Sequence, residues 1–94
     1  TEELLLNNNQ VFDISPLEGL TNLSILSLQN NLISDISPLV ANLGLGNWDS
    51  VWLQYNQLDL SPGSDDMQNI NALIARGVTV YYDPQGPAPS SAIH

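Results

Sequence analysis

The chain of 94 residues is long enough for one domain, and its 43% hydrophobic content is ordinary for a globular core. Ten acidic residues face a single basic one, Arg76, for a formal net charge of -9 at pH 7. This balance argues against nucleic acid and anionic membrane surfaces as partners, because both bind through clustered Lys and Arg. The chain has no cysteine, which excludes disulfides and thiolate metal sites.

No apolar run approaches the about 18 residues that a membrane-spanning helix requires. No signal peptide is recognisable, and the chain begins at Thr1 without an initiator methionine. We therefore expect a processed product, a piece of a longer protein, or a designed or truncated chain.

The first unit of the chain predicts a short strand over residues 3–7. By the two-residue period of a strand, Leu4 and Leu6 should point inward and their neighbours outward. Asn9 should then turn the chain, with its amide bonded to backbone groups. Ser15 should cap a short helical segment that has Pro16 in its first turn.

The same pattern returns 22 positions later, from Leu4-x-Leu6-x-x-Asn9 to Leu26-x-Leu28-x-x-Asn31, and both copies continue into Asp-Ile-Ser-Pro-Leu. A third copy follows, with Leu45, Trp48, Val51, Leu53, Asn56 and Leu58 in corresponding positions. The inward residues of the copies should stack, and the asparagines should form a ladder. In the second copy the stacking residues are Leu20, Leu23, Leu26, Leu28, Ile33, Ile36 and Leu39.

The connection into the third copy is longer than the one before it. Residues 40–42 therefore read as an insertion, and Gly44 and Gly46 should let the chain bend into the third strand. Trp48 occupies a leucine position and is expected in the core.

The pattern changes after Asn56. Ser64 or Asp65 can cap a helix that runs to about Arg76, with Met67, Ile70, Leu73 and Ile74 on its apolar face. Gly77 should end this helix, and residues 78–82 should form a last strand. Residues 83–94 are rich in Pro, Gly and Ser and read as a tail or linker.

The repeats resemble those of bacterial leucine-rich-repeat proteins of the internalin-like kind. The resemblance rests on Leu20, Thr21, Leu23, Leu26, Leu28, Asn31, Ile33, Asp35, Ile36, Pro38 and Leu39. Residues 58–82 are similar to the closing unit of such arrays. The resemblance implies a non-enzymatic binding or scaffold module, extracellular or at the cell surface, without cofactors.

The expected fold is an α/β solenoid in a right-handed coil. A short parallel sheet should line its concave face, and short helical segments its convex face. We expect repeats at about 1–19, 20–44 and 45–63, a helix–strand cap at 64–82, and the tail at 83–94.

Aligning the repeats predicts which residues share the concave face. Three columns result: Glu3–Ile25–Ser50, Leu5–Ser27–Trp52 and Asn7–Gln29–Gln54, with Thr79 and Tyr81 extending the last two. A rigid aromatic with amide neighbours suits protein or glycan recognition. The predicted binding residues are Leu5, Ile25, Ser27, Gln29, Trp52, Gln54, Thr79 and Tyr81.

Catalytic machinery is not expected. His94 is the only histidine, so neither a Ser-His-Asp triad nor a histidine metal site is supported. Asp13 and Asp35 occupy equivalent positions, where structural turn chemistry is the expected role and calcium binding an open alternative.

The missing front cap supports a second hypothesis. Leu4, Leu6, Val11, Ile14 and Leu17 should keep one open side, which either further repeats or another copy of the chain would cover. In the second case the chain is a self-assembling filament subunit, with head-to-tail contacts.

Overall fold

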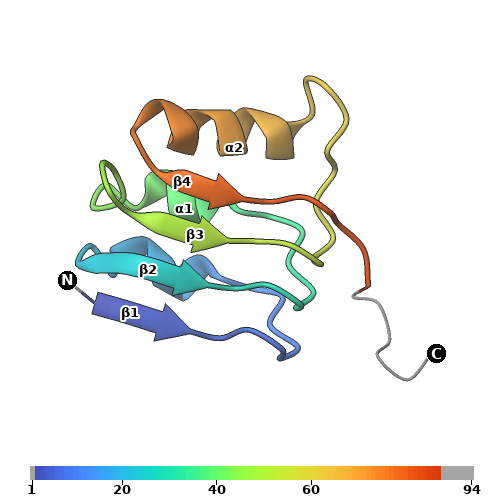
Figure 1. The fold of residues 1–94 in the computed structure, drawn as a ribbon, viewed down its shortest axis with the longest axis horizontal. Helices are drawn as coiled ribbons and strands as arrows, with labels where there is room; N and C mark the ends of the chain where they lie inside the picture. Colours follow the sequence, from blue (N-terminus) through green and yellow to red (C-terminus); the bar gives the residue numbers. More distant parts are fainter. Residues whose placement is uncertain (1, 88–94) are drawn as a thin grey trace.

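The computed structural model describes residues 2–87. Its four strands form one parallel sheet in the order β1-β2-β3-β4, which is also their order in the sequence. Figure 1 shows the strands stacked side by side, each from a successive unit of the chain. The elements are β1 (Glu2–Leu5), η1 (Ser15–Gly19, a 3₁₀ helix), β2 (Leu23–Ser27), α1 (Ser37–Ala41), β3 (Ser50–Trp52), α2 (Asp65–Ala75) and β4 (Thr79–Tyr81).

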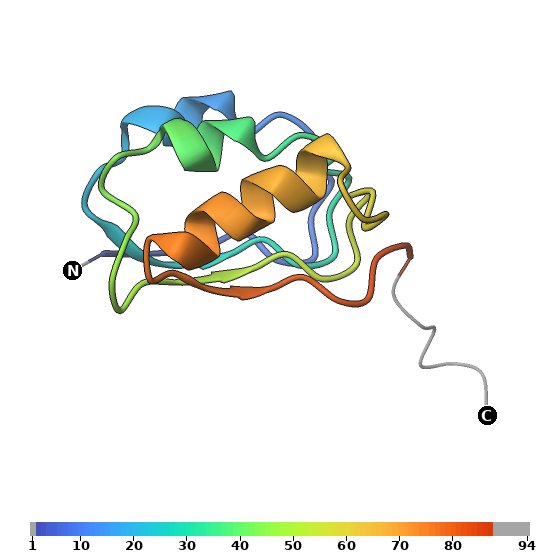
Figure 2. The ribbon, with the colours of Figure 1, turned by 90° about the horizontal axis from the view of Figure 1, so that it is seen from above.

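All the helical segments cover one face of the sheet, which leaves the other face open (Figure 2). Successive strands pair directly, and on the helical side α1 packs against both η1 and α2. No helix among residues 2–87 is long and apolar enough to cross a membrane.

The core lies between these two layers and is built from the repeated leucines and isoleucines. Leu26, Leu28, Ile33, Ile36 and Leu39 are completely buried, as the repeat alignment predicts. The corresponding residues of the first unit, Leu4, Leu6 and Val11, are only partly buried because β1 is an edge strand. The core also includes Ile14, Leu17, Leu23, Leu45, Val51, Leu53, Leu58, Ile70, Leu73 and Val78.

Three residues that were expected in the core lie outside it. Leu20 is 44% exposed, because it follows η1 directly as the chain turns toward β2. Ile74, at the end of α2, is 45% exposed. Trp48 is 94% exposed, since the turn between Gly46 and Asp49 sets its φ to 74°.

The predicted asparagine ladder is confirmed. Asn31 donates from Nδ2 to the carbonyls of Leu6 and Leu28, at 2.9 and 3.0 Å, and its Oδ1 accepts from the backbone N–H of Val11. Asn56 repeats these contacts one unit later, with the carbonyls of Leu28 and Leu53 and the N–H of Ile33. Each asparagine thus links its own unit to the preceding one.

Gln85 adds a fourth rung that the sequence analysis missed. Its Nε2 donates to the carbonyls of Leu53 and Tyr82, and its Oε1 accepts from the N–H of Leu58. These positions correspond one by one to the partners of Asn56. The stretch from Pro84 to Gly86, interpreted as tail, is therefore hydrogen-bonded to the preceding unit. Residues 88–94 of the same interpretation lie outside the described residues.

The helical segments begin differently from the expectation. Ser15 does not cap η1; instead, the carboxylate of Asp13 accepts from the backbone N–H of Ser15 at 2.9 Å. Asp35 makes the same bond to Ser37 and Asp59 the same bond to Ser61. An Asp side chain that folds back on the N–H two residues later forms a local turn, which is the structural role expected of this position.

Asn42 is the structural centre of the longer connection, at the end of the segment interpreted as an insertion. It is fully buried and donates from Nδ2 to the carbonyls of Leu17 and Leu20, at 2.9 and 3.0 Å. The guanidinium of Arg76 in turn donates to the carbonyls of Val40 and Asn42 at the end of α1. Two side chains therefore hold together the ends of η1, α1 and α2.

Helix α2 agrees closely with its prediction. The Ser64 hydroxyl accepts from the N–H of Met67 at 3.1 Å, which caps the helix, and Ile70 and Leu73 bury its apolar face. Gly77 ends it with φ +96°, a backbone conformation that favours glycine.

Candidate functional site

The face of the sheet that turns away from the helices, hereafter the outer face, is the predicted concave face. Strand register places Leu5, Ser27 and Trp52 in one row, and Glu3, Ile25 and Ser50 in the next, as the repeat alignment predicts. The parallel pairing extends past the strands, since Asn8 donates to the carbonyl of Gln29 and Asn30 donates to that of Gln54.

The predicted register of the last strand is wrong by two residues. Thr79 lies beside Ser50 and Tyr81 beside Trp52, whereas the prediction placed Tyr81 beside Gln54. The spacing Tyr82-x-x-Gln85 matches Leu53-x-x-Asn56 and would have given the correct register. In the observed register, the aromatic side chains of Trp52 and Tyr81 are neighbours.

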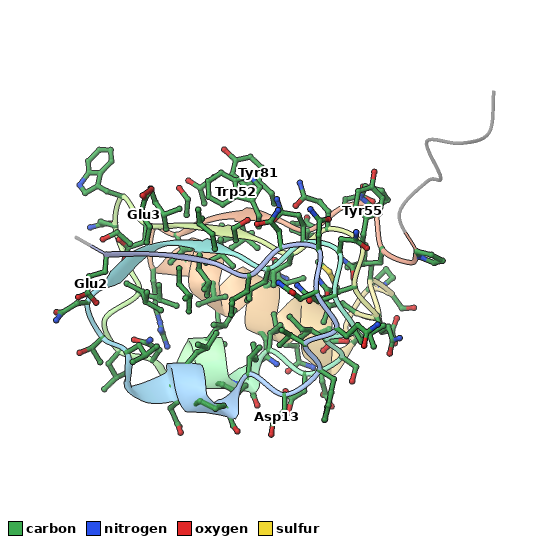
Figure 3. All side chains as sticks on the ribbon, turned by 90° about the horizontal axis from the view of Figure 1, so that it is seen from below. Glu2, Glu3, Asp13, Trp52, Tyr55 and Tyr81 are labelled. Atoms are coloured by element: carbon green, nitrogen blue, oxygen red, sulfur yellow. The ribbon has the colours of Figure 1, made fainter. Side chains whose placement is uncertain are left out.

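Trp52 and Tyr81 stack on each other. Their ring centroids are 5.0 Å apart and the ring planes are inclined by 15°. Figure 3 shows both rings projecting from the outer face, opposite to the side where Asp13 lies. Tyr81 is 43% exposed and Trp52 is partly buried. The pair forms a rigid aromatic ridge on two neighbouring strands.

Ser27 supports this surface rather than offering a free contact. It is buried, at 7% exposure, and its hydroxyl donates to Gln29 Oε1 at 2.6 Å. In the same row, Leu5 is 63% exposed. The accessible part of the row therefore consists of Leu5 at one end and the aromatic pair at the other.

Gln54 is the polar residue of this face whose hydrogen bonding is incomplete. Its Oε1 is buried and has no hydrogen-bond partner within the described part of the chain. An unpaired buried acceptor costs about 1–3 kcal/mol. Because the protein itself covers this atom, Gln54 Oε1 is not one of the accessible contacts of the outer face.

The charges near the outer face are negative. Glu3 lies on the same side of the sheet as Trp52 and Tyr81 (Figure 3). Asp83 is exposed two residues after the end of β4. Arg76, the one Lys or Arg of the chain, is bound to α1 on the helical side.

The residues predicted to remain open at the β1 edge divide into two groups. Leu4, Leu6 and Val11 are partly buried, and no strand of the described residues pairs with the free edge of β1. Ile14 and Leu17 are buried at 2% and 6% exposure, so the expectation that they stay open is wrong. They belong to the helical layer, which packs on their own and the next unit.

A hollow of about 740 Å³ lies on the helical side between α2 and the turn before α1, lined among others by Asp35, Asp59, Asp65 and Asp66. Asp35 and Asp59 each accept a backbone N–H in their own turns, and Asp66 accepts from the N–H of Asp59 at 2.8 Å. Within residues 2–87, no three His, Cys, Asp or Glu side chains are placed to hold a metal ion.

The same turns lower the pKa of two carboxyl groups. Hydrogen bonds from the backbone and then the hydroxyl of Ser15 hold the pKa of Asp13 below its ordinary value of 3.8. The hydroxyl of Ser61, followed by its backbone N–H, holds the pKa of Asp59 below 3.8 as well. Both groups are anions at neutral pH and already have partners, which is consistent with a turn-forming role.

The comparisons with known proteins agree with the repeats. Residues 2–41, which include β1, η1, β2 and α1, match the model of a family described as Leucine Rich repeats (2 copies). No curated protein and no solved structure matches the chain. The small parallel sheet with few helices is compatible with a solenoid of such repeats. The match over residues 2–41 supports a leucine-rich-repeat protein, and such repeats are typically protein-binding scaffolds rather than enzymes.

Proposed function

We propose that the chain recognises a protein through its outer face, with the stacked pair Trp52–Tyr81 as the anchor. The observation that carries the proposal is this aromatic pair, 5.0 Å between centroids, in one row with the exposed Leu5. Aromatic side chains on a rigid sheet lose little entropy on binding, and they dominate the energetics of many protein interfaces.

Glycan recognition is the less favoured use of the same surface. An aromatic ridge beside a 63% exposed leucine fits an apolar side chain of a protein better.

We further propose that α2 and β4 close the array at this end. Gln85 supports this proposal, because its side chain bonds the Leu53 carbonyl and the Leu58 N–H of the preceding unit, as the next ladder asparagine would. The resemblance to internalin-like repeats is the basis for proposing a right-handed coil, a bacterial source and a location at the cell surface or outside the cell.

Self-assembly by head-to-tail stacking is the alternative, and the partly buried Leu4, Leu6 and Val11 at the unpaired edge of β1 favour it. The other end of the sheet disfavours it. Each ladder side chain accepts a hydrogen bond from a backbone N–H of the preceding unit, two residues after that unit's own ladder residue. A unit stacked after Gln85 would need the N–H of residue 87, which is Pro87 and has none.

The anchor can be tested with two matched tryptophan variants. Columns that carry the wild-type chain, Trp52→Ala or Trp48→Ala are loaded with the same protein extract, and the captured proteins are quantified by mass spectrometry. Trp48 is the control because it is 94% exposed but lies in a turn. Trp52→Ala should lower capture of the partner about tenfold or more, the effect of losing about 1.4 kcal/mol or more at an anchor.

The proposal fails if the Trp52→Ala and wild-type columns retain the same proteins in the same amounts. Tyr81→Ala, at the sheet edge, serves as a second anchor variant should Trp52→Ala fold poorly by circular dichroism.

A further inference from the structure

The outer face carries the Glu3 carboxylate and two aromatic rings, and within residues 2–87 no Lys or Arg lies on it. Glu3 is exposed on β1 and lies on this face (Figure 3), and Asp83 is exposed two residues after the end of β4. Arg76 is the only Lys or Arg in the sequence, and its guanidinium is bound to the carbonyls of Val40 and Asn42 on the helical side. Within the described residues, no Lys or Arg therefore neutralises these two carboxylates.

Two features of this face suit the same kind of side chain. The ring pair Trp52–Tyr81 offers π-electron density, which attracts Lys and especially Arg. Glu3 adds an exposed carboxylate on the same side of the sheet. Lys and Arg side chains are hydrogen-bond donors that pair with a carboxylate.

We propose that the outer face binds a segment of its partner protein that carries arginine or lysine. A cationic side chain lies against the Trp52–Tyr81 ridge, and the carboxylates of Glu3 and Asp83 flank the segment. The net charge of -9 steers such a cationic partner toward the chain and repels acidic proteins. This inference rests on the proposed function, because it uses the same surface and the same anchor.

Four synthetic peptides provide the probe. They share one set of apolar residues and differ only at their polar positions, which are all Arg, all Lys, all Gln or all Glu. Binding to the full chain is measured by isothermal titration calorimetry at about 0.1 M and about 1 M salt, where the Debye length is about 10 Å and about 3 Å.

The Arg peptide should bind most tightly, the Lys peptide next, and the Gln peptide about tenfold more weakly than the Arg peptide. High salt should weaken the Arg peptide and leave the Gln peptide nearly unchanged. Trp52→Ala and Tyr81→Ala should each weaken the Arg peptide by about tenfold, Glu3→Gln by about two- to threefold, and Trp48→Ala not at all.

Two results overturn the inference. If the Gln or Glu peptide binds as tightly as the Arg peptide but still needs Trp52, the preference for cations is wrong while the proposed function stands. If the Arg peptide binds the wild type, Trp52→Ala and Trp48→Ala equally, net charge alone attracts it, and both the inference and the anchor fall. Glu3→Gln changes an exposed residue of an edge strand, so its result does not depend on the folding of the aromatic variants.

Discussion

Asn31 and Asn56 hold the molecule together at the scale of single residues. Each is buried, and each side chain satisfies two carbonyls and one backbone N–H that no neighbouring strand reaches. A buried backbone group without a partner costs about 1–3 kcal/mol, so these amides stabilise the turns after the strands far more than a surface hydrogen bond does. Asn9 has the same position in the first unit but is exposed.

This difference gives a matched pair of substitutions. Asn56→Ala leaves the carbonyls of Leu28 and Leu53 and the N–H of Ile33 without their partner, and should lower the free energy of unfolding by about 3 kcal/mol. Asn9→Ala removes bonds to the carbonyls of Leu6 and Asn7 at an exposed turn, and should cost about 1 kcal/mol or less. Urea unfolding of both variants measures the difference, and equal losses would contradict the burial argument.

Individual residues could be predicted from the sequence where the repeat spacing holds. The inward leucines and the ladder asparagines follow from that spacing, because a two-residue period and a fixed turn leave no other arrangement. Trp48 could not be placed, since the turn from Gly46 to Asp49 rather than the leucine slot decides its conformation. The ladder position of Gln85 could have been predicted from its spacing to Tyr82, but the Pro-rich composition around it indicated a tail instead.

At the scale of elements, close approach between two connecting segments depends on small residues. A Cβ added to Gly44 would lie 2.0 Å from the carbonyl oxygen of Thr21, so the connection after α1 rests directly on the backbone before β2. A Cβ added to Gly46 would have its nearest neighbour, the Arg76 carbonyl oxygen, at 3.7 Å, which is ordinary contact. Both glycines have backbone angles open to other residues.

Gly44→Ala should therefore destabilise the protein by about 2 kcal/mol through overpacking against rigid backbone. Gly46→Ala should change the stability by less than about 1 kcal/mol, and a small gain would reflect a less flexible unfolded chain. Thermal unfolding in a calorimeter compares the two variants. A Gly44→Ala protein as stable as Gly46→Ala would mean that the connection after α1 can move away from Thr21 without cost.

The element pattern was largely predictable, whereas the contacts between elements were not. The strands, the Ser64 cap of α2 and the stop at Gly77 follow from local signals. The register of β4 depends on which inward residue meets Val51, and the local sequence offered Val78 and Val80 equally well. The hydrogen bonds from Asn42 to the end of η1 and from Arg76 to the end of α1 join residues more than 20 positions apart, so no local sequence pattern predicts them.

As a whole, residues 2–87 form a two-layer stack in which β1 is one edge strand of the sheet and β4 is the other. At the β1 edge, the partly buried Leu4 and Leu6 could pack against another strand. At the β4 edge, Pro87 has no N–H to donate to a ladder side chain of a further unit. Like charges also repel at close range, because each copy carries a net charge of -9.

We therefore expect single chains of 10.2 kDa at micromolar concentration and physiological salt, measured by light scattering. Filaments in electron micrographs would contradict this prediction and support the alternative of head-to-tail stacking. In that event Leu6→Asp, which places a charge on the β1 end, should abolish the assembly, whereas Leu43→Asp should not, because Leu43 is already 85% exposed and lies in the connection after α1.

The contrast between the two tryptophans gives the molecule a built-in optical reporter. Trp48 is surrounded by water, whereas Trp52 is partly buried against the ring of Tyr81. Replacing Trp48 leaves a single indole emitter, located at the centre of the outer face. The colour and intensity of its fluorescence then respond to whatever covers the Tyr81 side of that surface, so that binding can be followed in real time on an unlabelled chain.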